Sequence, residues 1–175
     1  MIQIVTDSAA MLPDVVRRRF GICVAAITIT IDGEDFAEGV DLTAAEFYSR
    51  VAAGSVVSTA APSPGTFVEM YRAAASRGAT GVLSVHTGAA YSATLASAAI
   101  AADMVDVAVT LVDTGVGSFP VALAVWETAE ALERGASVED AAAAAERTAA
   151  GTASLFVVGV PNVARSGGRF VGVDG

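Results

Sequence analysis

The stretch GVLSVHTGAAYSATLASAAIAADM, residues 81–104, joins a strand-like segment to a helix-like segment through a loop rich in small residues and hydroxyls. Residues 81–85 are mostly apolar, which predicts a buried strand. Residues 92–104 are rich in alanine and nearly free of charge, which predicts a helix packed against the core. The hydroxyls of Ser92 and Thr94 stand where this helix should begin, either as ordinary helix caps or as part of a binding site.

The rest of the chain repeats this alternation of apolar strands and helices. Strands that are apolar throughout and alternate with helices pair in parallel and are covered on both faces. The sequence therefore predicts an α/β fold with three layers, a parallel sheet between two layers of helices. The predicted strands are 2–6, 22–31, 81–85, 107–113 and 154–160, and the predicted helices are 13–20, 43–54, 65–78, 92–104, 118–135 and 140–151.

Composition argues against nucleic-acid binding and a membrane span. The 175-residue chain has a net charge of −9, and such a surface repels nucleic acid. The one dense basic cluster, Arg17 to Arg19, is interpreted as a solvated helix end, with a partner-docking patch as the alternative. No apolar run reaches the roughly twenty residues that span a bilayer, and the N-terminus lacks signal-peptide features. Cys23, the only cysteine, is expected to be a buried thiol in a reducing cytoplasm.

Motifs for catalysis, cofactors and metals are weak. One histidine and one cysteine cannot complete a zinc site, and neither a P-loop nor a strand-anchored GxGxxG is present. A triad of Ser92, His86 and Asp113 can be written on paper, but no GxSxG elbow frames a serine. His86 is expected to be a packed or hydrogen-bonded imidazole. We therefore predict a protein that is not an enzyme, with no catalytic residue, no cofactor and no metal ligand.

Hydroxyl groups gather at the predicted strand ends. Ligands of open parallel sheets bind where loops leave the carboxyl ends of strands, and here those loops are 6–8, 85–94 and 113–118. Residues 58–64, STAAPSP, form a further predicted loop, in which Ser63 caps the next helix. A helix N-terminus with neighbouring hydroxyls can hold a carboxylate or phosphate without any basic side chain.

Five segments resemble, in order and spacing, the DegV family of bacterial fatty-acid-binding proteins. The resemblance covers essentially the whole chain. It implies a fatty acid whose chain lies in an apolar tunnel and whose carboxylate is held by the threonine of a TSQPSP motif and the serine of an SGT motif. Several members present the fatty acid to a separate kinase that makes acyl-phosphate. The segments are IVTDSAAMLP (4–13), VVSTAAPSPGTFVEMY (56–71), VLSVHTGAAYSATLASA (82–98), TLVDTGVGS (110–118) and VARSGGRF (163–170).

Matching these motifs position by position gives the candidate site. TSQPSP falls on residues 59–64, so Thr59 is the first candidate donor to the carboxylate. SGT falls on residues 92–94, so Ser92 is the second. Thr94 is either a weaker candidate or a helix cap, and Arg169 of the GGR motif is either structural or a further contact to the head group.

The resemblance also predicts how the chain is divided. Residues 1–160 are expected to form a DegV-like α/β domain, and residues 161–175 are the start of a second domain of which most is missing. The favoured function is binding of a long-chain fatty acid for phosphorylation by a separate kinase in the cytoplasm. The alternative is a degenerate DegV-like remnant that acts as an interaction or regulatory module without a small ligand. That alternative predicts an exposed apolar surface, and hence a homodimer or aggregate.

Overall fold

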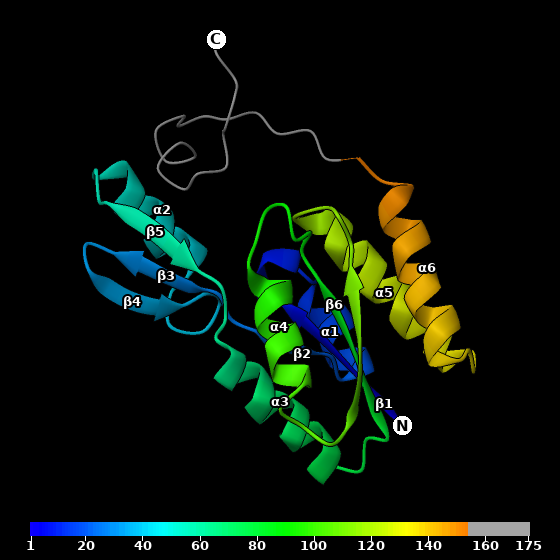
Figure 1. Cartoon of the computed structure of the whole chain (residues 1–175). Coiled ribbons are helices and arrows are strands. Elements are labelled where there is room, and N and C mark those ends of the chain that lie inside the picture. Colours follow the sequence, from blue (N-terminus) through cyan, green and yellow to red (C-terminus); the bar gives the residue numbers. More distant parts are fainter. Residues whose placement is uncertain (154–175) are drawn as a thin grey trace. The chain divides into compact units, whose positions relative to one another are not determined.

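The computed structural model describes residues 1–153, which fall into two compact units (Figure 1). Residues 1–25 and 61–153 make up the first unit. Residues 26–60 make up the described part of the second. No helix in these 153 residues combines the length and the apolar character needed to cross a membrane.

The first unit is built on a parallel sheet of four strands in the order β2-β1-β6-β7. Its strands are β1 (Ile2–Asp7), β2 (Cys23–Ala25), β6 (Gly81–His86) and β7 (Ala108–Asp113). Its helices are the 3-10 turn η1 (Ser8–Ala10), α1 (Asp14–Phe20), α3 (Pro64–Ser76), α4 (Thr94–Ala102), α5 (Phe119–Glu133) and α6 (Val138–Ala150).

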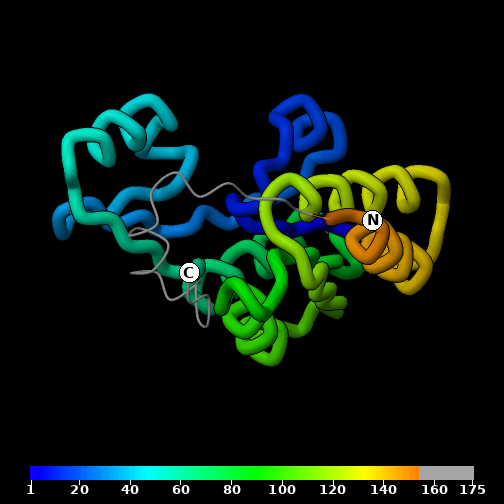
Figure 2. The backbone as a smooth tube through the Cα atoms, turned by 90° about the horizontal axis from the view of Figure 1, so that it is seen from above, coloured from blue at the N-terminus to red at the C-terminus, as the bar shows by residue number. Residues whose placement is uncertain are grey.

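Alternate residues of the central strands enter two different hydrophobic cores. On β6, Leu83 and Val85 pack with the buried residues of α5 and α6, whereas Val82 packs with those of α3 and α4. The two layers of helices can be followed in the view from above (Figure 2). The predicted α/β fold, a parallel sheet between two helical layers, is confirmed for this unit.

Serine side chains cap the starts of two helices in the first unit, and the cap at Ser63 was predicted from the sequence. Ser63 Oγ accepts a hydrogen bond from Thr66 N at 3.1 Å at the start of α3. Ser137 Oγ accepts one from Asp140 N at 3.0 Å at the start of α6. These side chains satisfy amides that the first helical turn leaves without a backbone partner.

The second unit is an antiparallel sheet, which the sequence analysis did not predict. Its strands lie in the order β4-β3-β5 and are β3 (Thr28–Ile31), β4 (Glu34–Ala37) and β5 (Val57–Ala60), with α2 (Ala44–Ala52) between β4 and β5. Ile29, Ile31 and Leu42 form its own small core. Helix α2 begins with a capping box, in which Thr43 and Glu46 exchange hydrogen bonds in both directions.

Two predictions about this region are wrong. The single strand over 22–31 is two strands, since β2 ends at Ala25 and β3 begins at Thr28, and they belong to different sheets. The apolar residues 22–27 run directly into alternating Thr and Ile over 28–31 with no turn residue between them, so the change of sheet was not recognised. The loop over 58–64 begins with residues of β5, because its small polar residues pair with β3 while facing solvent.

The predictions for Cys23 and for the basic cluster had different outcomes. Cys23 is half-buried rather than buried, and its Sγ lies 3.8 Å from a guanidinium nitrogen of Arg77, because β2 is the edge strand of the sheet. Arg17, Arg18 and Arg19 do form the last turn of α1 and are largely exposed. The predicted strand 154–160 and the predicted domain boundary at 160 lie outside the described residues.

The turn between β3 and β4 gives a prediction about pH. Asp32 Oδ1 accepts a hydrogen bond from Val56 N at 2.8 Å. This bond, together with one from the Ser55 side chain, holds the pKa of Asp32 below its ordinary value of 3.8. A lowered folded pKa means that the stabilisation is present above the unfolded pKa and is lost as pH falls through the folded pKa.

We therefore expect the Val56 amide to lose protection from hydrogen exchange on acidification below pH 3.8, after correction for the intrinsic exchange rate. NMR exchange measurements at neutral and acidic pH would test this. Asp32→Asn is the control, because asparagine tolerates the positive φ of 51° at this position but carries no charge. Equal acid sensitivity in both proteins would contradict the assignment.

Candidate functional site

Three titratable side chains end three neighbouring strands of the first unit. Asp7 is the last residue of β1, His86 of β6 and Asp113 of β7. His86 pairs with Asp113 in the β6–β7 register, and Val5 pairs with Ser84 in the β1–β6 register, which sets Asp7 beside His86 two residues later. The loops that follow these strands therefore leave the sheet at one edge, as the sequence analysis expected.

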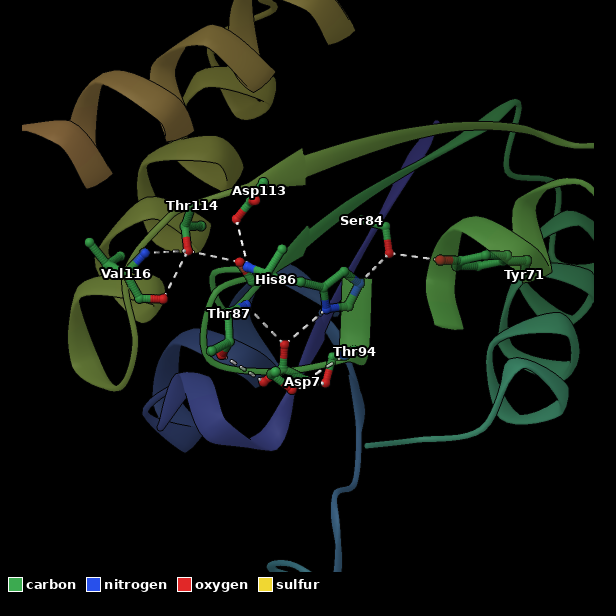
Figure 3. Close-up of polar contacts among 11 residues, drawn as sticks. Asp7, Tyr71, Ser84, His86, Thr87, Thr94, Asp113, Thr114 and Val116 are labelled. Atoms are coloured by element: carbon green, nitrogen blue, oxygen red, sulfur yellow. Dashed lines mark hydrogen bonds and ion pairs between the residues drawn. The ribbon is translucent and has the colours of Figure 1, made fainter. Parts of the chain in front are cut away.

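A chain of hydrogen bonds runs from this edge into the core (Figure 3). His86 Nδ1 lies 2.9 Å from Asp7 Oδ2, and His86 Nε2 lies 2.7 Å from Ser84 Oγ. Ser84 Oγ in turn lies 2.9 Å from the hydroxyl of Tyr71, whose pKa is raised by burial. All four residues are fully buried, so each polar atom is satisfied inside the protein.

This chain of bonds replaces the triad that could be written from the sequence. Both ring nitrogens of His86 are occupied by Asp7 and Ser84, so neither is left for Ser92 or Asp113. The order Asp–His–Ser is that of a hydrolase, but Ser84 is buried and hydrogen-bonded to a tyrosine, which keeps its hydroxyl from a substrate. The interpretation of His86 as a packed, hydrogen-bonded imidazole is confirmed.

Ser92 and Thr94 lie together at the start of α4. The helix begins at Thr94 with Ala93 as its N-cap, two residues later than the predicted start. Ser92 Oγ accepts a hydrogen bond from Thr94 N at 3.2 Å and lies 2.8 Å from Thr94 Oγ1. Ser92 is half-buried, whereas Thr94 is fully buried.

The first turn of α4 keeps two amides available. The N–H groups of Leu95 and Ala96 have no hydrogen-bond acceptor among residues 1–153. These amides and the hydroxyl of Ser92 form a set of donors at the positive end of a helix, which favours an anion.

The roles of Thr59 and Arg169 at the head group stay predictions. Thr59 lies on β5 of the second unit, opposite Ile29, and it is exposed. Thr59 and Ser92 belong to different units, and their pairing stays a prediction. Arg169 lies outside the described residues.

Among residues 1–153, His, Cys, Asp and Glu side chains do not gather in any group of three that could hold a metal ion.

A family model described as "Uncharacterised protein, DegV family" matches residues 1–175. The chain belongs to the DegV family. A DegV domain-containing protein of Streptomyces coelicolor is 35% identical over 168 residues, which cover 96% of this chain and 60% of that relative. The resemblance found in the sequence is confirmed.

Solved structures similar to this DegV chain include proteins that are described as binding fatty acids. A DegV family protein from Thermus thermophilus, described as binding fatty acid, has a TM-score of 0.79 and 35% identity, covering 85% of this chain and 53% of that chain. A stearic acid-binding protein from Eubacterium ventriosum has a TM-score of 0.76 and 25% identity, covering 82% of this chain and 51% of that one. The chain thus spans 60% of the curated relative and about half of each solved structure.

Sequence reasoning assigned no role to three buried polar residues that lie inside the matched DegV segments. Asp7 lies in the matched segment IVTDSAAMLP (4–13), yet it received no role, and neither did Ser84 or Thr87. One signal was readable, because Ser84 and His86 are two residues apart on a predicted strand and therefore share a face. The pairing of His86 with Asp7, 79 residues away, depends on the register of β1 and β6.

Proposed function

We propose that this DegV chain binds a long-chain fatty acid without catalysing a reaction on it. The carboxylate of the fatty acid is held by the hydroxyl of Thr59 and by that of Ser92, which lies at the N-terminus of α4. Arg169 makes a further contact to the head group. The observation that carries the proposal is the half-buried Ser92 beside two available amides of α4, in a family whose relatives are described as fatty-acid-binding.

The hydrogen bonds of Ser92 support its role as a donor. Its oxygen accepts the amide of Thr94, and Thr94 Oγ1 lies within hydrogen-bond distance. If Thr94 donates to Ser92, the Ser92 proton is left to point toward a ligand. We assign Thr94 the task of orienting Ser92, since Thr94 is fully buried and only Ser92 is accessible.

The energetics fit a ligand with a charged head and an apolar tail. A carboxylate in an apolar site needs several donors, which hydroxyls and helix amides supply. Each buried methylene of the acyl chain then contributes about 0.8 kcal/mol, so an enclosed apolar tunnel would favour long chains. Because hydroxyls and helix amides supply most of the donors, the carboxylate can be presented to a separate kinase in the cytoplasm for phosphorylation.

Ser92→Ala is expected to weaken oleate or palmitate binding about tenfold or more, because one hydrogen bond to a charged group is lost. Thr59→Ala should weaken it by a similar factor. Affinity would be measured by titration calorimetry, after mass spectrometry of a denatured extract has identified any fatty acid that co-purifies.

The matched control is Ser97→Ala, which removes a hydroxyl from the same helix within one turn of its start. Its affinity should equal that of the unchanged protein. Unchanged affinity in both Ser92→Ala and Thr59→Ala would refute the head-group site. A protein that is empty and binds neither oleate nor palmitate would refute fatty-acid binding altogether and favour the interaction module.

A further inference from the structure

We propose that Asp7 and Asp113 are positioning residues for Ser92, holding from two sides the loop that carries it. This loop, residues 87–93, connects β6 to α4. The inference rests on the proposed function, because it assigns a purpose to the position of Ser92.

Asp7 fixes the beginning of the loop. Its Oδ2 accepts a hydrogen bond from Thr87 N at 3.1 Å, and its Oδ1 accepts one from Thr87 Oγ1 at 3.1 Å. His86 Nδ1 is the third donor to the same carboxylate. Since Asp7 is fully buried and ends a central strand, Thr87 is held against a rigid part of the sheet.

Asp113 fixes the middle of the loop. Its Oδ1 accepts hydrogen bonds from Ala89 N at 3.1 Å and from Gly115 N at 2.9 Å. Ala89 belongs to the β6–α4 loop and Gly115 to the loop between β7 and α5, so one exposed carboxylate joins two strand-end loops.

Gly88 links Ser92 to the loop between β7 and α5 through backbone hydrogen bonds. Gly88 N donates to Val116 O at 2.8 Å, which fastens it to the β7–α5 loop. Gly88 O in turn accepts from Tyr91 N at 2.9 Å and from Ser92 N at 3.2 Å. The amide of Ser92 is therefore two hydrogen bonds away from the loop that Asp113 holds.

The two aspartates differ in a way that separates positioning from folding. Asp7 is fully buried and also supports the core chain through His86, so its loss affects the whole unit. Asp113 is exposed, and its carboxylate bonds only to two loop amides among the described residues. Removing the Asp113 carboxylate should release the loop while the core stays intact.

The test compares Asp113→Ala with Asp113→Asn. Asparagine keeps a side-chain oxygen that can accept both amides, so it should restore what alanine loses. In Asp113→Ala, we expect amide exchange in residues 87–93 to accelerate about tenfold or more, and oleate affinity to fall about tenfold, with an unchanged melting temperature. Asp113→Asn should stay within about twofold of the unchanged protein in both measurements.

Two further variants separate the positioning role from general destabilisation. Ser84→Ala breaks buried bonds of the core chain but leaves the bonds of Asp7 and Asp113 to the loop, so it should lower the melting temperature without changing loop exchange. Asp7→Ala should lower the melting temperature and also accelerate loop exchange. If Asp7→Ala does not fold, the Asp113 pair still decides the proposal.

Hydrogen exchange of the loop amides can be measured without a ligand. The positioning role of the aspartates and the proposed fatty-acid binding can therefore fail separately. Unchanged exchange in Asp113→Ala would overturn the positioning role, whatever the affinity for oleate. Accelerated exchange with normal, Ser92-dependent oleate binding would also overturn it. Accelerated exchange in a protein that does not bind oleate at all would support control of the loop by Asp113 and would overturn the proposed function instead.

Discussion

His86→Ala is expected to lower the free energy of unfolding by about 3–5 kcal/mol. The imidazole is fully buried, with Asp7 at one ring nitrogen and Ser84 at the other, and it packs edge-on against Phe67 at a centroid distance of 5.2 Å. Alanine would leave the buried Asp7 carboxylate one donor short, leave Ser84 with only Tyr71, and open a cavity beside Phe67.

Urea denaturation followed by circular dichroism would measure this loss. Tyr71→Phe is the graded control, because it removes only the hydroxyl at the far end of the same chain of bonds and leaves Ser84 bonded to His86. We expect that control to cost about 1 kcal/mol. A loss below that of Tyr71→Phe would contradict the view that His86 is the central member of the chain.

Gly88→Ala is expected to cost about 1–3 kcal/mol of stability and to abolish most fatty-acid binding. A Cβ at this position would lie 2.7 Å from the carbonyl carbon of Gly115, 2.8 Å from its Cα and 3.0 Å from Val116 N. These are backbone atoms and cannot rotate away, so one of the two loops must move. Either movement breaks the bond from Gly88 to Val116 and displaces the amide of Ser92.

Gly65→Ala provides a matched comparison within the same unit. Its Cβ would meet only Ser63 Oγ, at an ordinary contact distance of 3.5 Å, and alanine favours the first turn of α3. Stability of this variant should be equal or slightly higher, with unchanged oleate affinity. If Gly88→Ala behaved like Gly65→Ala in denaturation and in oleate titration, the close approach of the two loops would have no role in the site.

Most of the parallel unit could be predicted from local signals. The strand β6 follows from its apolar run alone, and two helix starts follow from the cap residues Ser63 and Ser137. Each of these signals depends only on residues close in sequence, and the structure contains all three features. The predicted start of α4 was two residues too early, because a serine at position 92 is a typical N-cap residue. Ser92 Oγ does accept a hydrogen bond from the amide of Thr94, but Ser92 stands one residue before the N-cap, Ala93.

The antiparallel unit had only a weak local signal, and the loop contacts had none. Residues 22–31 contain no turn residue where the chain leaves one sheet for another, so only the alternation of Thr and Ile over 28–31 distinguishes β3 from the apolar β2. The hydrogen bond from Ala89 to Asp113 joins residues 24 apart, and that from Thr87 to Asp7 joins residues 80 apart. Such contacts depend on the register between paired strands. Register cannot be read from one segment alone, because it is set when the strands pair.

The insertion of residues 26–60 between β2 and α3 has a consequence for the order of folding. A hairpin such as β3–β4, closed by the short turn at Asp32 and Gly33, forms in about 1–10 μs, well before a parallel sheet assembled from distant strands. Once formed, it shortens the flexible segment that must close when β2 meets α3, although each halving of loop length saves only about 0.6 kcal/mol. Pairing of β1 with β6 should therefore limit the folding rate, and substitutions that destabilise the earlier-formed hairpin should mainly slow folding rather than speed unfolding.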